Sequence, residues 1–366
     1  MRVCFVSPYP LGMVSGISTL LLDLSDELRR KGHAGTFLGP AGDVRDPPMA
    51  LMDIRLGPKE GTVALARRTA RALRDAAGRF DLVHVQQPHP QTWAAARVAR
   101  SLGIPVVSTF HLKPPPSGRR LRRLADRIAE RNLLQRTRMV FVSEHTRKDF
   151  GAPSGTVIPN GVGRAVMEAA DLSKASARAA LGIGGKEFVF LFAGRQTRNK
   201  GYGELLRAMA GLKGRTFLCL ATGEAPPAEA AGYRALEAGL PRFRNLGRLD
   251  RSDWIQAALA SDAFLLPSHI EGMPMVLLEA MAFRLAPIVT AVGGVPEVVG
   301  RDEAVFVEAG DADGLARAMG SLLDRPEEAS ALGKRARRRL EQGFTMETCA
   351  RRYEAVYADA LNPGTT

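Results

Sequence analysis

The stretch HIEGMPMVLLEAMA, residues 269–282, says more about the fold of this chain than any other part of the sequence. It follows the apolar run SDAFLLPS at residues 261–268, which predicts a buried strand that ends in a turn. Pro274 suits the first turn of a helix, because that turn does not need the N–H that proline lacks. Glu271 is therefore expected on a loop at the carboxyl end of a strand, and Glu279 within the helix that follows.

A strand, loop and helix of this kind can bind a ligand that carries both negative charge and hydroxyl groups. The free backbone amides of a helix's first turn attract anions. Carboxylates on the loop and helix accept hydrogen bonds from hydroxyls. A sugar nucleotide has both kinds of group, so the stretch predicts a sugar-nucleotide site.

The rest of the chain alternates apolar strands with helical stretches, in two successive series. Its 366 residues are enough for two domains. The first series of expected strands lies at residues 2–7, 81–85, 105–109 and 139–143, and the second at 188–193, 217–221, 243–246, 263–267, 286–290 and 304–307. This alternation predicts an α/β protein with two doubly wound parallel sheets. Helices are expected at residues 18–31 and, near the end of the chain, at 346–361, and residues 163–186 are expected to connect the two halves.

Several motifs, in this order, resemble glycosyltransferase family 4. They are AGR at residues 193–195, NKG at 199–201, the pair Glu271 and Glu279 as an E-x7-E motif, VGGVPE at 292–297, and the interdomain segment VIPNGV at 157–162. The resemblance covers nearly the whole chain. It implies the GT-B architecture, two Rossmann-like domains facing a central cleft. Residues 1–165 would bind the acceptor, residues 166–345 would bind the nucleotide sugar, and the C-terminal helix 346–366 would pack back on the first domain.

The resemblance assigns donor contacts in the second half of the chain. Arg195 and Lys200 would bind the donor diphosphate, and their position after a buried strand agrees with this, because a diphosphate leaving group needs cations. Glu279 would accept hydrogen bonds from the ribose, and Glu271 would lie against the donor sugar. Donor binding by the helix start and its loop would involve Gly272, Met273, Met275 and Val276.

In the first half of the chain the resemblance places Gly16 in a loop near the donor phosphate and His111 near the donor sugar. Ser15 stands where the family usually has a first glycine, and with Glu144 it is assigned to the acceptor side. The alternative for His111 is a hydrogen-bonded histidine at a strand end without a catalytic role. Arg284 stands where the family usually has a glycine at a helix end, and it must tolerate or avoid a left-handed conformation there.

The predicted reaction is retaining, metal-independent transfer of a sugar from a UDP- or GDP-sugar. The acceptor would be a lipid-linked or envelope glycan or a small natural-product metabolite. Asp311 and Asp313 imitate a metal-binding D-x-D motif, but they lie just before an expected helix, where capping is the better interpretation. No cofactor is expected. A sugar-nucleotide epimerase is the main alternative, and a nucleic-acid-binding protein is another.

The chain is strongly basic, with a net charge of +13 and a pI of about 10.2. No helix-turn-helix, zinc-finger or aromatic RNA-binding signature accompanies this charge, so no nucleic acid is expected as a partner. Residues 118–138 contain eight arginines and an apolar stripe. This segment predicts either a helix packed on the first domain with a solvated basic face, or contact with an anionic membrane.

A cytoplasmic location is favoured by the three scattered cysteines and by the lack of a signal peptide or a membrane-spanning segment. Any peripheral membrane contact would then be at the inner face of the membrane.

Overall fold

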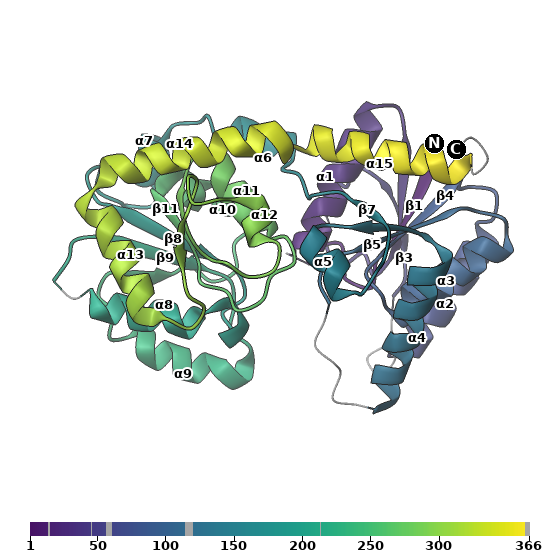
Figure 1. Cartoon of the computed structure of the whole chain (residues 1–366), viewed down its shortest axis with the longest axis horizontal. Coiled ribbons are helices and arrows are strands. Elements are labelled where there is room, and N and C mark those ends of the chain that lie inside the picture. The colour runs from purple at the N-terminus through teal and green to yellow at the C-terminus, as the bar shows by residue number, and fades with distance from the viewer. Residues whose placement is uncertain (14, 45, 56–60, 114–119, 213, 363–366) are drawn as a thin grey trace. The chain divides into compact units, whose positions relative to one another are not determined.

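The computed structural model of the chain describes residues 1–362 except 14, 45, 56–60, 114–119 and 213. The chain divides into two compact units. Unit 1 comprises Met1–Gly163 and Thr345–Thr366, and unit 2 comprises Arg164–Phe344. Each unit is a parallel sheet covered by helices (Figure 1). The expectation of two parallel α/β sheets is therefore confirmed.

Unit 1 has a seven-stranded sheet with the order β3-β2-β1-β4-β5-β6-β7. Its strands are β1 Arg2–Val6, β2 Ala34–Gly39, β3 Ala50–Asp53, β4 Leu82–Gln86, β5 Val106–Phe110, β6 Arg138–Phe141 and β7 Thr156–Val157. Its helices are α1 Gly16–Arg30, α2 Thr62–Asp75, α3 Pro90–Ser101, α4 Arg120–Arg136, α5 Glu144–Asp149 and α15 Met346–Leu361. The sequence did not reveal β2, β3 or β7 as strands. The edge strand β3 has only four residues and is mostly exposed, and β7 has only two, so neither has the long buried run of the central strands.

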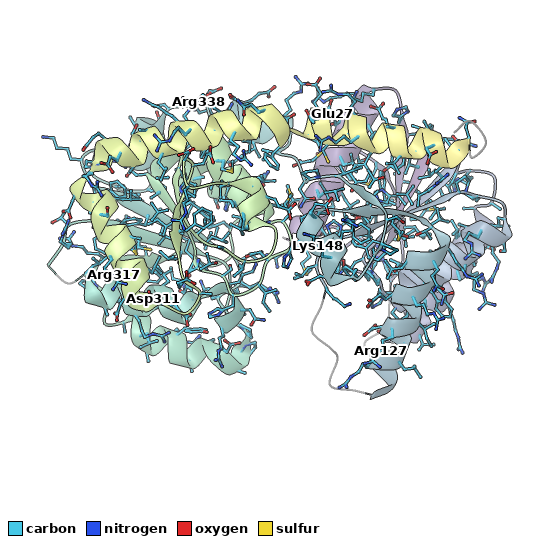
Figure 2. All side chains as sticks on the ribbon, viewed as in Figure 1. Glu27, Arg127, Lys148, Asp311, Arg317 and Arg338 are labelled. Carbon is cyan, nitrogen blue, oxygen red and sulfur yellow. The ribbon has the colours of Figure 1, made fainter. Side chains whose placement is uncertain are left out.

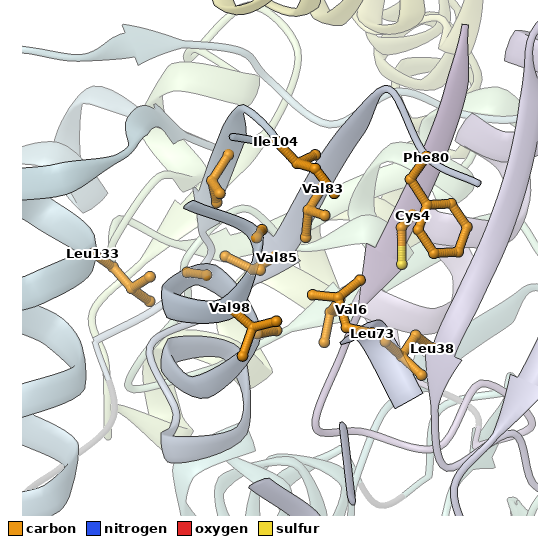
Figure 3. Close-up of a cluster of buried hydrophobic side chains, with 14 of the residues drawn as sticks. Cys4, Val6, Leu38, Leu73, Phe80, Val83, Val85, Val98, Ile104 and Leu133 are labelled. Atoms are coloured by element: carbon orange, nitrogen blue, oxygen red, sulfur yellow. The ribbon is translucent and has the colours of Figure 1, made fainter. Parts of the chain in front are cut away.

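The helices of unit 1 form two layers. On one side α2, α3 and α4 pack in succession, and on the other α1 packs against α15 (Figure 1). Figure 3 shows the core cluster in which Val6 and Val83 of the sheet meet Leu73 of α2 and Val98 of α3. The C-terminal helix α15 also packs on β5, and its Tyr353 and Tyr357 are fully buried.

Unit 2 has a six-stranded sheet with the order β10-β9-β8-β11-β12-β13. Its strands are β8 Val189–Ala193, β9 Leu218–Thr222, β10 Phe243–Asn245, β11 Ala263–Leu266, β12 Ala286–Thr290 and β13 Val305–Val307. Its helices are α6 Arg164–Ala169, α7 Lys174–Ala180, the 3-10 turn η1 Arg198–Lys200, α8 Tyr202–Gly211, α9 Pro227–Glu237, α10 Arg251–Ala260, α11 Met275–Ala282, α12 Val295–Val298, α13 Ala312–Asp324 and α14 Pro326–Gly343. All six strands expected in this half are present.

The segment expected only to connect the two halves is folded onto unit 2. It contains α6 and α7, and Asp262 at the start of β11 holds it in place. The Asp262 carboxylate pairs with Lys174 and with Arg178, each at 2.6 Å, and also accepts a hydrogen bond from the Val189 amide. One carboxylate thus fixes α7 beside the first strand of the unit.

Arg284 does adopt the left-handed conformation, with a φ of 60°. Its guanidinium donates to the Ala170 carbonyl at 3.1 Å and to Asp171 Oδ1 at 2.7 Å. These contacts, which a glycine could not make, offset the backbone strain of a residue with a Cβ in this conformation.

Candidate functional site

In each sheet the strand order reverses at one point, so that the chain continues to opposite sides from two neighbouring strands. Candidate residues lie at these points. In unit 2 the change falls between β8 and β11, and in unit 1 between β1 and β4. Ligands of open α/β sheets bind outside the carboxyl ends of strands at such points. In unit 2 the loop after β8 carries Arg195 and Lys200, and the loop after β11 carries Glu271.

The loops after β8 and β11 are joined at close range. Gly201 has a φ of 68°, and a Cβ added to it would lie 2.0 Å from the Pro267 carbonyl oxygen, so only glycine fits. The His269 amide donates to the Asn199 carbonyl at 2.8 Å. As a result Lys200 Nζ lies 2.6 Å from Glu271 Oε1. The structure thus brings together two residues that the sequence could only assign separately.

Arg195 occupies the same loop but is not tied down. Its side chain is exposed and makes no hydrogen bond or ion pair with any residue in the part of the chain that the structure describes. The next residue, Gln196, is buried and anchors the loop, donating from Nε2 to the Gly223 carbonyl and to Asn245 Oδ1, both at 2.9 Å. The backbone carrying Arg195 is therefore fixed while its guanidinium remains available to a ligand.

The loop that carries Glu271 packs closely against the turn that contains Gly293 and Gly294. Gly293 has a φ of 57°, and a Cβ there would lie 1.7 Å from the Glu271 carbonyl oxygen. The Gly294 amide donates to the Gly272 carbonyl at 2.8 Å. The two glycines of the VGGVPE motif therefore allow the close approach that shapes the Glu271 loop.

The helix α11 begins at Met275, after Pro274 as its N-cap. Within the described residues the amides of Met275 and Val276 donate to no other group, as expected for a first turn. The side chains of Met273 and Met275 are buried, and Val276 is half-buried. The turn thus offers backbone donors to an anion at the same edge of the sheet as Lys200 and Glu271.

Glu279 lies in the middle of α11 and is buried. Its Oε1 atom lies 2.5 Å from Nη1 of Arg251, the first residue of α10, whose side chain is 43% exposed. Burial raises the pKa of the Glu279 carboxyl, and the charge and hydrogen bond of Arg251 oppose that rise. Sequence reasoning did not find Arg251, because no local pattern links it to a residue 28 positions later.

In unit 1, His111 directly follows β5 and is buried. Its Nε2 atom lies 2.8 Å from Gln86 Oε1, and its backbone amide donates to Gln87 Oε1 at 2.9 Å. Burial lowers the pKa of His111 to about 3, so the ring is neutral at pH 7. Sequence reasoning also missed Gln86 and Gln87. Their position at the carboxyl end of the buried strand β4 is a signal that could have found them.

In two other loops of unit 1 the predicted residues lie at the start of a helix. Ser15 is the N-cap of α1 and accepts from the Ser18 amide at 3.1 Å, and Gly16 opens the helix. Glu144 lies in the first turn of α5 and pairs with Arg147 at 2.8 Å. Both positions lie at the carboxyl edge of the sheet, after β1 and β6, as His111 does after β5.

Among the described residues there is no group of three or more His, Cys, Asp or Glu side chains that could hold a metal ion. Asp311 caps α13 by accepting from the Gly314 amide at 2.8 Å, and it lies 3.5 Å from Arg317 (Figure 2). The capping interpretation of the D-x-D sequence is confirmed.

Most of the basic segment 118–138 forms α4; residues 118–119, before the helix, and the side chains of residues 120–122 lie outside the described part. Ala129 and Leu133 face the core, whereas Leu124 and Ile128 are 56% and 39% exposed. The apolar stripe of the basic segment consists of Leu121, Leu124, Ala125 and Ile128. For Leu124 and Ile128 the interpretation that the stripe packs on the first domain is wrong, because the inward face of α4 is set by later positions. Arg127 extends from the same helix (Figure 2). In the described residues no helix is long and apolar enough to span a membrane.

Two family models match the chain in succession. "Glycosyltransferase Family 4" matches residues 14–165, and "Glycosyl transferases group 1" matches residues 173–339. The chain belongs to glycosyltransferase family 4. As a member of this family it transfers a sugar from a nucleotide-sugar donor.

Curated relatives and solved structures agree with this membership. The phosphatidyl-myo-inositol mannosyltransferase of Mycolicibacterium smegmatis is 27% identical over 93% of this chain and 90% of that protein. The D-inositol 3-phosphate glycosyltransferase of Kineococcus radiotolerans is 26% identical over 96% and 92%. Anabaena Alr3699/HepE, solved in complex with UDP-glucose, has a TM-score of 0.81 and 17% identity, covering 98% of this chain and 100% of that chain. The fold of this glycosyltransferase is accordingly the GT-B architecture.

Proposed function

We propose that this glycosyltransferase moves a sugar from a UDP- or GDP-sugar to an acceptor nucleophile with retention of the anomeric configuration. The observation that carries the proposal is the set of groups at the carboxyl edge of the unit 2 sheet. Arg195 without a partner among the described residues, Lys200, the buried Glu271 and Glu279, and free helix amides all lie there. A nucleoside-diphosphate sugar carries the complementary anions and hydroxyls.

The diphosphate contacts follow from charge. Arg195 and Lys200 bind the two phosphates, and the first-turn amides of Met275 and Val276 assist them. Lys200 can bind both a phosphate oxygen and Glu271, because its ammonium has three donors and the ion pair uses one. As the glycosidic bond to the phosphate breaks, these cations stabilise the charge that develops on the leaving diphosphate. The Gly16 loop of unit 1 contributes to phosphate binding.

The sugar and ribose contacts follow from hydrogen-bonding capacity. Glu279 accepts from the ribose hydroxyls, and Glu271, supported by Gly272 and Met273, accepts from the transferred sugar. His111 of unit 1 contacts the same sugar as a neutral ring.

Retention is proposed to proceed on one face of the donor sugar. The acceptor oxygen forms the new bond as the phosphate leaves, and the acceptor proton passes to the departing phosphate oxygen. No divalent ion is assigned, because Arg195 and Lys200 supply positive charge at the leaving group. Two acceptor classes remain: a lipid-linked or envelope glycan, and a small natural-product metabolite. Ser15 and Glu144 are assigned to the acceptor side.

Exposed apolar and basic side chains on α4 favour a peripheral contact with an anionic membrane. Leu124 and Ile128 are exposed beside Arg127, the combination that an interfacial helix uses. Co-sedimentation with phosphatidylglycerol vesicles, with phosphatidylcholine vesicles as the control, tests this contact. Binding to the anionic vesicles that is lost in Leu124→Ser/Ile128→Ser supports it, and equal recovery with both vesicles contradicts it.

The donor site is tested by calorimetric titration with UDP-, GDP-, ADP- and dTDP-sugars, with and without EDTA. Binding of a UDP- or GDP-sugar that EDTA does not change is expected. The anomeric configuration of the product, read by NMR, tests retention, and clean inversion would contradict it. Formation of an altered sugar nucleotide without any acceptor would instead indicate an epimerase.

A further inference from the structure

A buried hydrogen-bond network leads from His111 to the C-terminal helix. His111 Nε2 lies 2.8 Å from Gln86 Oε1, and Gln86 Nε2 lies 3.0 Å from His84 Nε2. On the other side of the His84 ring, Nδ1 lies 2.7 Å from the hydroxyl of Tyr357. These four residues, His111, Gln86, His84 and Tyr357, form the buried network.

The donors and acceptors of the buried network fit together in one direction. In the orientation that the structure gives the Gln86 amide, its nitrogen faces His84 and donates, so His84 Nε2 is the unprotonated acceptor. The neutral His84 ring then carries its proton on Nδ1 and donates it to the Tyr357 oxygen. At the other end Gln86 Oε1 can only accept, so His111 carries its proton on Nε2. The tautomer of His111 is therefore linked to the tautomer of His84 through the orientation of one amide.

The surroundings shield the buried network from solvent. His84, Gln86 and Tyr357 are almost completely buried, and the His84 ring is packed against Tyr353 and Tyr357 with ring centroids 5.2 and 5.6 Å away. Burial lowers the pKa of His84 to about 3, and the nearby His111 contributes, so the ring is neutral at pH 7. A buried neutral imidazole with partners on both nitrogens has its tautomer set by those partners.

A second set of hydrogen bonds joins His84 to α15 through Thr109 and Tyr353, and it does not include His111. Thr109 Oγ1 lies 2.7 Å from His84 Nε2 and 3.0 Å from the Tyr353 hydroxyl. The Thr109 hydroxyl accepts from Tyr353 and donates to the same His84 Nε2 lone pair that the Gln86 amide uses, so both contacts require that nitrogen to be unprotonated. Loss of the Tyr353 hydroxyl leaves that donation possible, whereas loss of the Tyr357 hydroxyl removes the acceptor for the His84 Nδ1 proton.

We propose that Tyr357, acting through His84 and Gln86, is a positioning residue that fixes His111 as its Nε2–H tautomer. The other ring nitrogen, Nδ1, makes no hydrogen bond to any described residue. It is therefore free to accept a hydrogen bond from a hydroxyl of the transferred sugar. This step rests on the proposed contact between His111 and that sugar. Through this network the C-terminal helix α15, far from His111 in the sequence, helps to fix the protonated nitrogen of His111.

The tautomer is measured directly by two-dimensional NMR of the protein labelled with 15N-histidine, at pH 7 and without ligand. His111→Ala and His84→Ala identify the two signals among the six histidines. Wild type is expected to show His111 protonated on Nε2. Tyr357→Phe keeps the ring but removes the acceptor, so His111 should become a mixture of both tautomers. Tyr353→Phe, which also loses one buried hydroxyl from α15, should leave the His111 tautomer unchanged.

Turnover provides the second measurement. Tyr357→Phe should lower kcat about 10-fold, the scale of one buried hydrogen bond, while Tyr353→Phe should stay within about 2-fold. A His111 protonated on Nδ1 in wild type, or a tautomer unaltered in Tyr357→Phe, would overturn the network alone. Normal turnover of His111→Ala would instead overturn the role of His111 in transfer, and the positioning role with it.

Discussion

Replacing Glu279 with glutamine isolates the charge of the proposed ribose-binding carboxylate. The amide has nearly the same shape, but it offers one acceptor oxygen in place of two and no charge. A hydrogen bond to a charged group contributes about 2 kcal/mol net, so we expect donor Kd to rise about 30-fold.

The free energy of unfolding of the protein should not fall in Glu279→Gln. A carboxyl whose pKa is raised by folding favours the folded state at low pH, and that contribution is lost as pH rises through the raised value. At pH 7 the ionised Glu279 therefore costs stability, and glutamine removes this cost.

The assay compares calorimetric Kd values for a ribose donor and for its 2′-deoxy analogue. Wild type should lose about 10-fold in affinity for the deoxy compound, and Glu279→Gln should lose little further, because the missing hydroxyl and the missing carboxylate belong to the same contact. Glu303→Gln is the matched control. Glu303 caps the Gly300 amide just before β13, at the amino end of that strand. Equal sensitivity of Glu279→Gln and wild type to loss of the 2′-hydroxyl would refute the ribose assignment.

Three further predictions have defined outcomes. Arg195→Ala and Lys200→Ala should each lower kcat about 100-fold or more, and near-normal turnover in both would remove them from the mechanism. Arg251→Met removes the charge that opposes the raised pKa of Glu279. Because binding needs the ionised carboxylate, the loss of donor affinity on acidification should begin at higher pH than in wild type, and an unshifted pH profile of Kd would contradict this. Arg284→Gly should be more stable to thermal unfolding than Arg284→Ala by about 1 kcal/mol. Both variants lose the contacts to residues 170–171, but only alanine keeps the strain of the left-handed backbone conformation. Equal stability of the two variants would contradict the strain argument.

Local sequence patterns predicted much of unit 2. The apolar runs gave its six strands, and the position of Pro274 placed Glu271 on a loop and Glu279 in a helix, where the structure has them. The final helix was also predicted at 346–361, the bounds of α15. Prediction failed where the local signal was weak. The edge strand β3 is largely exposed, and α7 depends on a distant carboxylate, that of Asp262, for its place on the unit.

The sequence alone determined the alternating architecture, the family resemblance and the candidate residues one by one, because periodicity and motif spacing are local properties of the chain. Tertiary structure decided which of these residues meet. It paired Lys200 with Glu271, 71 positions away, and joined His84 to Tyr357, 273 positions away. It also assigned Arg251 to Glu279 and turned Leu124 outward. Such contacts depend on how loops and helices pack at the edges of the two sheets, and no periodicity within a short window of sequence records that packing.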